Sequence, residues 1–491
     1  MRAPIAAALL LLLLLAPPAH GGALHTDGRF FRDAGGGAVI LRGVDVAGNA
    51  KVPPFTPISD GALLDPLPRW GLDVVRLLFT WEAYEPQPGA YDANYLAYYR
   101  RAVTEAAARG LYVVVDFHQD GFSRFDLGGC GEGFPAWTLP PTVPPATPDN
   151  GTACADWGSR MLGDKVLPQI WSAFYADGNG ARTRYLSMIA RVAAALADLP
   201  MVVGYDLLNE PGGDERRELA PFYEDAVRAL RAVDPSAIVF VSPGYLTSGG
   251  VATQLARPSF DNLAYAPHYY DPSLFLFHGW QGDDGSGAFG EMNGTAAAWN
   301  VPLFVGELGA SPSTDMVGGY LDMLYRQLDV ALASGAQWVY TPGWTPGAKD
   351  GWNGEDFSIV DDTGALRANF QPRPYARRVA GTPQSLGVSA EPIRARNALQ
   401  LTWHHDPAAG QTELFAPAAW FGGSLAISAD GDVTCSRDGD LVRCQAPTAG
   451  DKRVRLAAPA RRCGLTGGEA VLLLALLARW RRRAARARAT G

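Results

Sequence analysis

The chain has 491 residues, of which 47% are apolar and 19% are charged, so it can bury a large core and is not a disordered protein. This length is typical of one large domain combined with a smaller one. The formal net charge of −8 gives no reason to expect nucleic acid as a partner.

The first 23 residues have the pattern of a secretory signal peptide. One arginine precedes an apolar run over residues 5–16, and small residues and prolines follow it. This run is too short and has the wrong flanks for a membrane-spanning helix. We therefore predict that residues 1–23 direct export and that the protein is secreted to the extracellular space.

Export permits disulfide bonds, and the chain has five cysteines. Cys130 and Cys154 lie in the same loop-rich stretch, and Cys435 and Cys444 lie near two predicted strands. We expect these two pairs to form disulfides, which leaves Cys463 without a partner.

Between residues 24 and 380, short apolar runs alternate with helical patterns. Eight strands followed mostly by helices are typical of a (β/α)₈ TIM barrel, although a doubly wound sheet gives the same alternation. We predict the barrel because polar and aromatic residues gather where nearly every strand ends, and because no glycine-rich phosphate motif follows the first strand. The predicted strands are 38–42, 74–78, 112–116, the apolar part of 201–211, 237–241, 263–267, 301–306 and 337–340, and the main helices are 96–109, 185–199, 222–233 and 320–333.

One segment inside residues 24–380 and one beyond them depart from the alternation. Residues 121–165 form a long Gly- and Pro-rich insertion, and loops of this length are usually functional or pinned. Residues 386–457, beyond the barrel, contain short runs separated by Gly, Asp and Pro, which predict a small antiparallel β-sandwich.

Two of the predicted barrel strands end in a glutamate. Residues 201–211 read MVVGYDLLNEP and end near Glu210, and residues 301–309 read VPLFVGELG and end near Glu307. The C-terminal ends of barrel strands form the active-site face. Cleavage of a glycosidic bond needs two carboxyl groups, one to protonate the leaving oxygen and one to attack or to activate water. The pair therefore predicts a glycosidase site.

The segments LRGV, HQD, NEP, HYY and GELG, in this order, resemble glycoside hydrolase family 5. More narrowly, DFHQD, the LNEP context, APHYY and a sandwich after the barrel resemble the endoglycoceramidases and their close relatives. The resemblance covers about residues 35–455. It implies Glu210 as the acid/base and Glu307 as the nucleophile of a retaining mechanism.

The resemblance also implies roles for residues around the two glutamates. Asn209 is expected to bind the sugar 2-hydroxyl, and Tyr270 to donate a hydrogen bond to the nucleophile. Arg42 is expected either to support the nucleophile from below or to form a structural ion pair under the site. His118, Asp120, Lys51 and His268 are expected to contact the substrate.

Many members of this family end the eighth strand with a tryptophan that forms a platform for the sugar. Here WVYT aligns Thr341 with that position, so Trp344 or Trp338 is expected to supply the ring. No cluster of His, Cys and carboxylate has metal-ligand spacing, and we expect neither a metal nor another cofactor.

The implied substrate is a glycosphingolipid, cut between the first sugar and the ceramide. The apolar segment 274–280 (LFLFHGW) is a candidate for contact with the lipid chains, or it packs against the insertion. The alternatives are a β-glucanase or mannanase acting on polysaccharides, and a glycan- or glycolipid-binding surface protein without catalysis.

Residues 461–491 combine Cys463, a Gly-rich spacer, a short apolar run and a cluster of arginines. The run is well short of the roughly twenty residues that span a bilayer. This layout resembles the C-terminal sorting tails of myxobacterial surface proteins, which implies anchoring to the cell envelope. A basic tail that touches anionic lipid is the alternative.

Overall fold

The computed structural model describes residues 24–389 and 397–459. The predicted signal peptide and the C-terminal tail with Cys463 lie outside the described residues, so the predictions for them stay predictions. Of the helices in the described ranges, none is both long and apolar enough to cross a bilayer.

Eight parallel strands form a barrel, which confirms the predicted fold class. Their order is β10, β11, β4, β5, β6, β7, β8 and β9, and a parallel bridge between Tyr265 and Leu303 brings the two edges together. The strands are β4 (Arg42–Val46), β5 (Val74–Thr80), β6 (Tyr112–His118), β7 (Val202–Asp206), β8 (Ile238–Val241), β9 (Leu263–Tyr265), β10 (Phe304–Val305) and β11 (Ser334–Tyr340).

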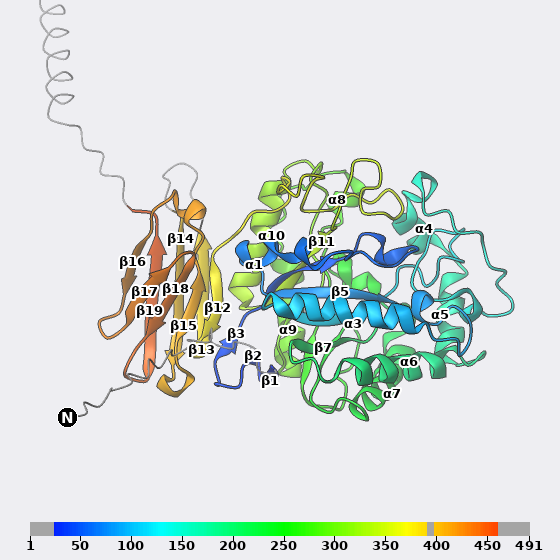
Figure 1. The fold of residues 1–491 in the computed structure, drawn as a ribbon, viewed down its shortest axis with the longest axis horizontal. Coiled ribbons are helices and arrows are strands. Elements are labelled where there is room, and N and C mark those ends of the chain that lie inside the picture. Colours follow the sequence, from blue (N-terminus) through cyan, green and yellow to red (C-terminus); the bar gives the residue numbers. More distant parts are fainter. Residues whose placement is uncertain (1–23, 390–396, 460–491) are drawn as a thin grey trace, which may run out of the picture.

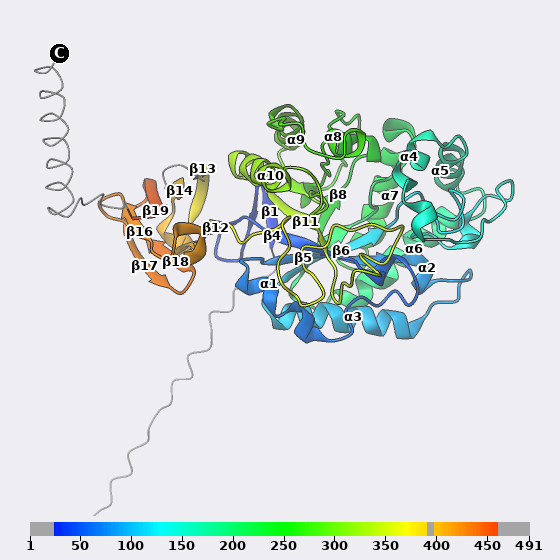
Figure 2. The same cartoon turned by 90° about the horizontal axis from the view of Figure 1, so that it is seen from above.

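Helices cover the outside of this barrel, as Figures 1 and 2 show. The long helices have one apolar face and close the core between strands and helices. The helices are α1 (Pro66–Arg69), α2 (Trp81–Tyr84), α3 (Ala93–Ala108), α4 (Trp157–Gly163), α5 (Leu167–Tyr175), α6 (Ala181–Leu196), α7 (Ala220–Arg231), α8 (Ser273–Leu276), α9 (Ser286–Trp299) and α10 (Val317–Ala331).

Alternation along the strands divides side chains between the inside and the outside of the barrel. In β5, Val75 and Leu77 pack in the outer core, whereas Val74 packs in the inner one. Arg76 therefore points into the barrel, at the height where polar side chains take the place of apolar ones. At the other end of the barrel, Phe31 closes the interior with its ring 5.9 Å from that of Phe240.

A two-sheet antiparallel sandwich follows the barrel. One sheet has the order β1-β2-β3-β12-β15-β18-β17, and the other has the order β13-β14-β19-β16. The strands are β1 (His25–Asp27), β2 (Phe30–Arg32), β3 (Ala38–Val39), β12 (Tyr375–Val379), β13 (Gly381–Ser389), β14 (Ala398–His405), β15 (Thr412–Phe415), β16 (Ala426–Ala429), β17 (Thr434–Asp438), β18 (Leu441–Gln445) and β19 (Gly450–Ala457).

The N-terminal segment corrects one predicted strand. Residues 38–42 are not one barrel strand, because β3 pairs with β12 in the sandwich and the first barrel strand begins at Arg42. Ala38 and Ile40 pack into the sandwich core, whereas Leu41 packs inside the barrel. Because residues 38–42 form one continuous apolar run, the sequence does not indicate that the chain passes from the sandwich core to the barrel core within it.

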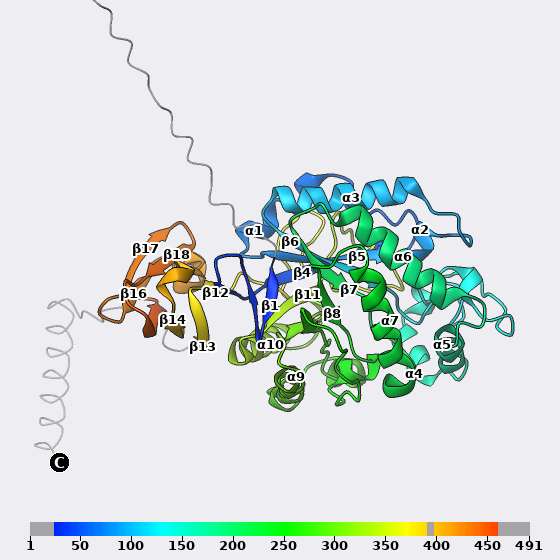
Figure 3. The ribbon, with the colours of Figure 1, turned by 90° about the horizontal axis from the view of Figure 1, so that it is seen from below.

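Both predicted disulfides, Cys130–Cys154 and Cys435–Cys444, are present. The first lies in the insertion, near α4, and the second joins β17 to β18. In Figures 1 and 3 the sandwich and helices α4 and α5 lie at opposite ends of the molecule. The sandwich therefore leaves the insertion side of the barrel uncovered.

Candidate active site

Glu210 and Glu307 come together around the imidazole of His268. Nδ1 of His268 lies 2.9 Å from Oε1 of Glu210 and 3.6 Å from Oε2 of Glu307. One carboxylate oxygen of each glutamate and one nitrogen of His268 all lie within 4.8 Å of one another. Burial alone would lower the pKa of His268, but Glu307 and Glu210 raise it above its ordinary value.

His268 fits between the glutamates because of a glycine beside it. A Cβ atom at Gly306 would lie 2.8 Å from Nε2 of His268 and 2.9 Å from its Cδ2. The glycine of the GELG segment therefore leaves the space that the imidazole occupies.

Glu307 accepts a hydrogen bond at each carboxylate oxygen. The hydroxyl of Tyr270 donates to Oε2 at 2.9 Å, as predicted, and Nη1 of Arg76 donates to Oε1 at 3.0 Å. Arg76 is fully buried and also pairs with three aspartates of the barrel interior, Asp45, Asp116 and Asp206. This guanidinium compensates negative charge in a site from which water is largely excluded.

The structure decides between the two roles predicted for Arg42. Its guanidinium donates to Oδ1 of Asp329 at 2.9 Å and to the carbonyl of Ala333, and it lies over the ring of Tyr375. Arg42 therefore forms the structural ion pair that was the alternative, and Arg76 is the arginine that contacts Glu307. Arg42 begins β4, whereas Arg76 stands further along β5, nearer the active-site end.

Glu210 is held by its backbone and by its side chain. Its φ of 37° lies in the left-handed region, a conformation that costs a non-glycine residue of order 1–3 kcal/mol. Nε2 of Gln119 donates to the carbonyls of Asn209 and Glu210, at 2.6 and 3.0 Å, and supports this turn. The hydroxyl of Ser248 donates to Oε1 of Glu210 at 2.6 Å.

Asn209 is fully buried beside the two glutamates. Its Oδ1 accepts from Arg76 at 2.6 Å, which sets the orientation of the amide. Its Nδ2 donates to the carbonyl of Gln119 at 3.0 Å, a bond that uses one of the two amide N–H groups. The amide therefore has one N–H group left to donate to a ligand.

Three predicted substrate-binding residues form a second cluster next to the glutamates. Nζ of Lys51 lies 2.6 Å from Oδ2 of Asp120, and Nε2 of His118 lies 3.5 Å from the same oxygen. The ring of Trp338 stacks on His118, with centroids 5.5 Å apart, and Lys51 lies 4.4 Å from the centre of the Trp338 ring. Trp338, near the end of β11, is thus an aromatic residue of this cluster.

The structure does not bring Trp344 to this cluster. Its Nε1 donates to Asp356 at 3.1 Å, and the guanidinium of Arg367 lies over its ring at 4.3 Å. Among the described residues, its hydrogen bond and its ring contact thus lie within the loop after β11. Thr341, at the aligned platform position, donates to Asp350 instead.

The cluster around Lys51 contains two acids that the sequence did not single out, Glu132 and Glu355. Glu132 is completely buried, 3.5 Å from Nε2 of His118, and Glu355 lies 3.7 Å from Lys51. Burial raises the pKa of Glu132 to about 8 and that of Glu355 to about 7, against the attraction of the nearby cations. Burial opposes the charged form of His118 as well, yet Asp116 and Asp120 raise its pKa well above the ordinary value.

Two groups have the donors for a metal ion, namely His118, Asp120 and Glu132, and Glu210, His268 and Glu307. In the first group the ammonium of Lys51 already neutralises Asp120 at 2.6 Å. In the second group, Arg76 and Tyr270 donate to the oxygens of Glu307. Protein donors therefore already pair with Asp120 and with Glu307.

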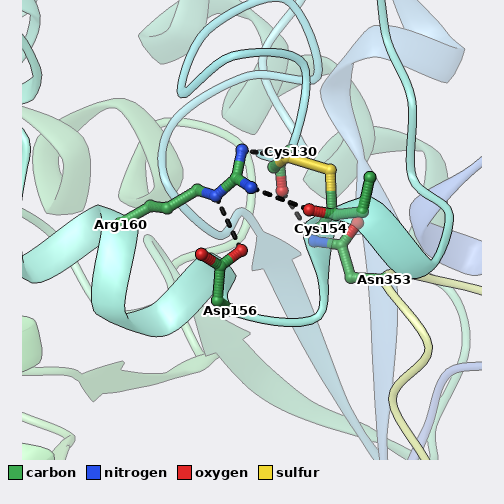
Figure 4. Close-up of a disulfide and its surroundings, with 6 residues drawn as sticks. Cys130, Cys154, Asp156, Arg160 and Asn353 are labelled. Atoms are coloured by element: carbon green, nitrogen blue, oxygen red, sulfur yellow. Dashed lines mark hydrogen bonds and ion pairs between the residues drawn. A yellow bond between two sulfur atoms is a disulfide. The ribbon is translucent and has the colours of Figure 1, made fainter.

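The insertion reaches this cluster through its disulfide, shown in Figure 4. The carbonyl of Cys130 accepts from Nδ2 of Asn353 at 2.7 Å, and Nη1 of Arg160 lies 3.4 Å from Sγ of Cys130. The neighbouring Trp352 packs at a tilt against Trp157 of α4, with ring centroids 4.8 Å apart, and its ring lies 4.1 Å from Nζ of Lys51. The disulfide therefore holds one wall of the Lys51 cluster.

Sequence reasoning missed Arg76, Gln119, Ser248, Glu132 and Glu355. Arg76 carried a usable signal, since an arginine inside the apolar run VVRLL needs a buried anionic partner. Gln119 lies inside the HQD segment. The other three occupy loops, where no periodicity indicates which way a side chain points.

Comparison with known proteins supports this fold. The family model described as cellulase (glycosyl hydrolase family 5) matches residues 33–349, and the glycoside hydrolase family 5 C-terminal domain matches residues 373–456. The chain is 27% identical to endoglycoceramidase I of Rhodococcus hoagii over 272 residues, which are 50% of this chain and 52% of that protein. It is 39% identical to a glucosylceramidase of Aspergillus fumigatus over 141 residues, 24% of this chain and 18% of that protein.

The chain thus spans about half or less of the length of these two relatives. A solved structure, endo-glycoceramidase II from Rhodococcus sp. in its ganglioside GM3 complex, has a TM-score of 0.70 and 25% identity, and the match covers 88% of this chain and all of that one. With one family model over well more than half of its length and a second over its sandwich, the chain belongs to glycoside hydrolase family 5.

Proposed function

We propose that this protein is a secreted, retaining endo-β-glycosidase that hydrolyses the bond between the oligosaccharide and the ceramide of glycosphingolipids. The approach of the Glu210 and Glu307 carboxylate oxygens to within 4.8 Å carries the proposal. Retaining glycosidases hold their carboxyl groups about 5–5.5 Å apart, whereas inverting enzymes need about 6.5–9.5 Å for a water molecule.

In the first step, a carboxylate oxygen of Glu307 attacks the anomeric carbon while Glu210 gives its proton to the glycosidic oxygen. The bond to the ceramide oxygen breaks, ceramide leaves as the alcohol, and the sugar remains as an ester of Glu307. In the second step, Glu210 takes a proton from water and the hydroxide attacks the same carbon. Glu307 is released as a carboxylate, and the free sugar keeps its original anomeric configuration.

The hydrogen bonds around the glutamates suit these roles. Tyr270 and Arg76 stabilise Glu307 as an anion and fix the direction of its attack. The second N–H group of Asn209 would donate to the sugar 2-hydroxyl, a contact that strengthens as positive charge develops on the ring. His268 and Ser248 orient the carboxyl group of Glu210.

Lys51, His118 and Asp120 supply charged hydrogen-bonding groups for sugar hydroxyls, and Trp338 supplies an aromatic face. A lipid substrate also needs an apolar surface at the site. Phe275, in the apolar segment after β9, provides one beside the glutamates, because its ring centroid lies 6.4 Å from that of Tyr270. The names of the similar proteins, an endoglycoceramidase and a glucosylceramidase, support a glycolipid as the substrate class.

The test is incubation of the purified protein with a panel of glycosphingolipids, with soluble β-glucan and mannan alongside, and mass spectrometry of the products. Release of intact oligosaccharide together with ceramide is the expected result. Cleavage of the polymers with untouched lipids would contradict the lipid substrate and assign the protein to the polysaccharide-degrading part of the family.

The variant Glu307→Gln separates an enzyme from a glycan-binding protein without catalysis. It keeps the size and the polarity of the side chain and removes the nucleophile. We expect product formation to fall by several orders of magnitude while binding of the glycolipid persists. Equal product formation by the variant and the wild type would rule out the two-glutamate mechanism.

Secretion and surface anchoring are proposed from residues 1–23 and 461–491. Expression of the full chain in its natural host, followed by cell fractionation, tests both. Export is expected, with the protein in the envelope fraction. Removal of residues 461–491 is expected to move it to the medium.

A further inference from the structure

An apolar rim stands beside the active site, made of Phe275, Leu276 and Phe277 in and after α8. These side chains are 63%, 71% and 65% exposed, and the two phenylalanines are the only exposed ones among the described residues. The flanking residues Leu274 and Trp280 pack against the barrel core. The segment is therefore anchored at both ends and presents the three apolar side chains between these anchors to water.

The rim adjoins the glutamates. The Phe275 ring contacts that of Tyr270, whose hydroxyl donates to Glu307. Two further loops of the same barrel end add exposed apolar side chains. Leu246, 55% exposed, lies in the short helix η6 (Tyr245–Gly249), and Met316, 65% exposed, follows Asp315, which bridges to Gly279 just after the rim.

The exposure of these side chains suits contact with an extended surface better than a closed groove. Residues that line a groove for a lipid chain are covered by its walls, whereas the rim side chains project from the surface. All of them leave water together when the whole surface meets another apolar phase.

The charge of the three loops that carry these side chains indicates which phase this is. Residues 243–253, 270–285 and 309–316 contain four aspartates and neither lysine nor arginine. Three of the aspartates, Asp283, Asp284 and Asp315, are exposed. An anionic lipid surface would be repelled, but a zwitterionic surface without net charge would not.

We propose that the rim docks the protein on neutral, zwitterionic lipid surfaces, with the active-site end of the barrel facing the membrane. The inference rests on the proposed function, because the bond between sugar and ceramide lies at the membrane surface. Docking would bring the catalytic site to the level of that bond before any substrate is bound.

The test is flotation of the full-length protein with phosphatidylcholine vesicles that contain no glycolipid. Neutral vesicles isolate the rim, because the arginines of residues 461–491 attract anionic lipid by a separate route. The test variant is Leu276→Ser with Phe277→Ser, which leaves the contact between Phe275 and Tyr270 intact. The matched control is Val330→Ser on α10, which is 69% exposed and stands near the opposite end of the barrel.

The wild type and the control are expected to float with the vesicles. The partition coefficient of the double variant is expected to be lower by about tenfold or more, because burying one large apolar side chain contributes roughly a factor of ten. Thermal unfolding of both variants checks that the fold is kept. Equal flotation of wild type and double variant, or no flotation of the wild type, would overturn the proposal. The proposal would also be overturned if the wild type and the control formed a dimer without lipid and the double variant did not. The rim would then bind a second copy of the protein.

This outcome is independent of the proposed function, because flotation requires no hydrolysis. A protein that floats but cleaves no glycolipid would contradict the proposed substrate alone. Hydrolysis of glycolipid without flotation would contradict docking alone.

Discussion

Each carboxylate oxygen of Glu307 accepts one hydrogen bond, and the bond from Tyr270 can be removed by a small substitution. Replacing Tyr270 by Phe removes the donor to Oε2 of Glu307 and leaves the ring in place. A hydrogen bond to a charged group is worth about 1.5–3 kcal/mol, so we expect kcat to fall by roughly ten- to a hundredfold. Steady-state kinetics on a cleaved substrate measures this.

The neighbouring Tyr269 is the matched control for that substitution, since its ring packs against Phe289 outside the catalytic cluster. Tyr269→Phe is expected to leave kcat unchanged. Similar losses of kcat in both variants would mean that tyrosine packing, and not the bond to Glu307, is responsible.

Glu132 makes stability depend on pH. Its pKa is raised from 4.5 to about 8, so the folded state holds one more proton than the unfolded state between these values. The stabilisation is complete below pH about 4.5 and is lost at about 1.4 kcal/mol per pH unit as the pH rises toward 8. In Glu132→Gln this loss is absent, and we expect the Tm of the variant to fall less than that of the wild type over this range.

Thermal unfolding of both proteins from pH 5 to pH 9 measures the difference. Glu355→Gln gives an independent check. Because the pKa of Glu355 is raised only to about 7, its effect on the Tm is expected to end at a lower pH than that of Glu132. Parallel curves for wild type and Glu132→Gln would show that Glu132 is ionised throughout.

At the level of elements, the insertion is a wall of the site, and its disulfide can be separated from general stability. Replacing Cys130 and Cys154 by Ser frees Trp352 and Asn353 from the insertion, so we expect KM to rise more than kcat falls. The free energy of unfolding of the region held by this disulfide is expected to fall by about 3–4 kcal/mol, from the entropy of a loop this long.

The second disulfide provides the control. Replacing Cys435 and Cys444 by Ser opens a shorter loop between β17 and β18, with an expected cost of about 2–3 kcal/mol. This change lies in the sandwich, so KM should stay at the wild-type value. An equal rise of KM in both double variants would contradict a local role for the insertion.

At the scale of the whole molecule, chain segments from before and after the barrel form one sheet of the sandwich. Strands β1 to β3 precede the barrel in the chain, yet they belong to the same sheet as β12, β15, β18 and β17. A chain that ends at Ala380 would keep β3 and β12 and lose the rest of the sandwich core, so Ile40 and Tyr375 would be exposed. We expect this truncated protein to aggregate or to unfold well below the wild-type Tm.

Circular dichroism and size-exclusion chromatography of the truncated protein test this expectation. A monomer with the wild-type Tm would show that the barrel is stable alone and that this sheet is only a connection.

Much of the fold could be predicted from the sequence because its signals are local. A buried parallel strand is a short apolar run, so seven of the eight barrel strands were found near their observed positions, with errors confined to their ends. Glu210 and Glu307 were identifiable because each follows such a run, and strand ends meet on one face of a barrel. The cysteine pairs were identifiable because each lies within a short, loop- or turn-rich segment.

The sequence by itself thus determined the barrel, the two glutamates at its active-site end and both disulfides. Only the tertiary structure decided which arginine contacts Glu307, since Arg42 and Arg76 both lie in apolar runs and their heights in the barrel depend on the stagger of the closed sheet. It also decided that β3 joins the sandwich, and that Ser248 and Glu132 reach the site. These contacts join residues far apart in the chain, and no local periodicity encodes the distances between them.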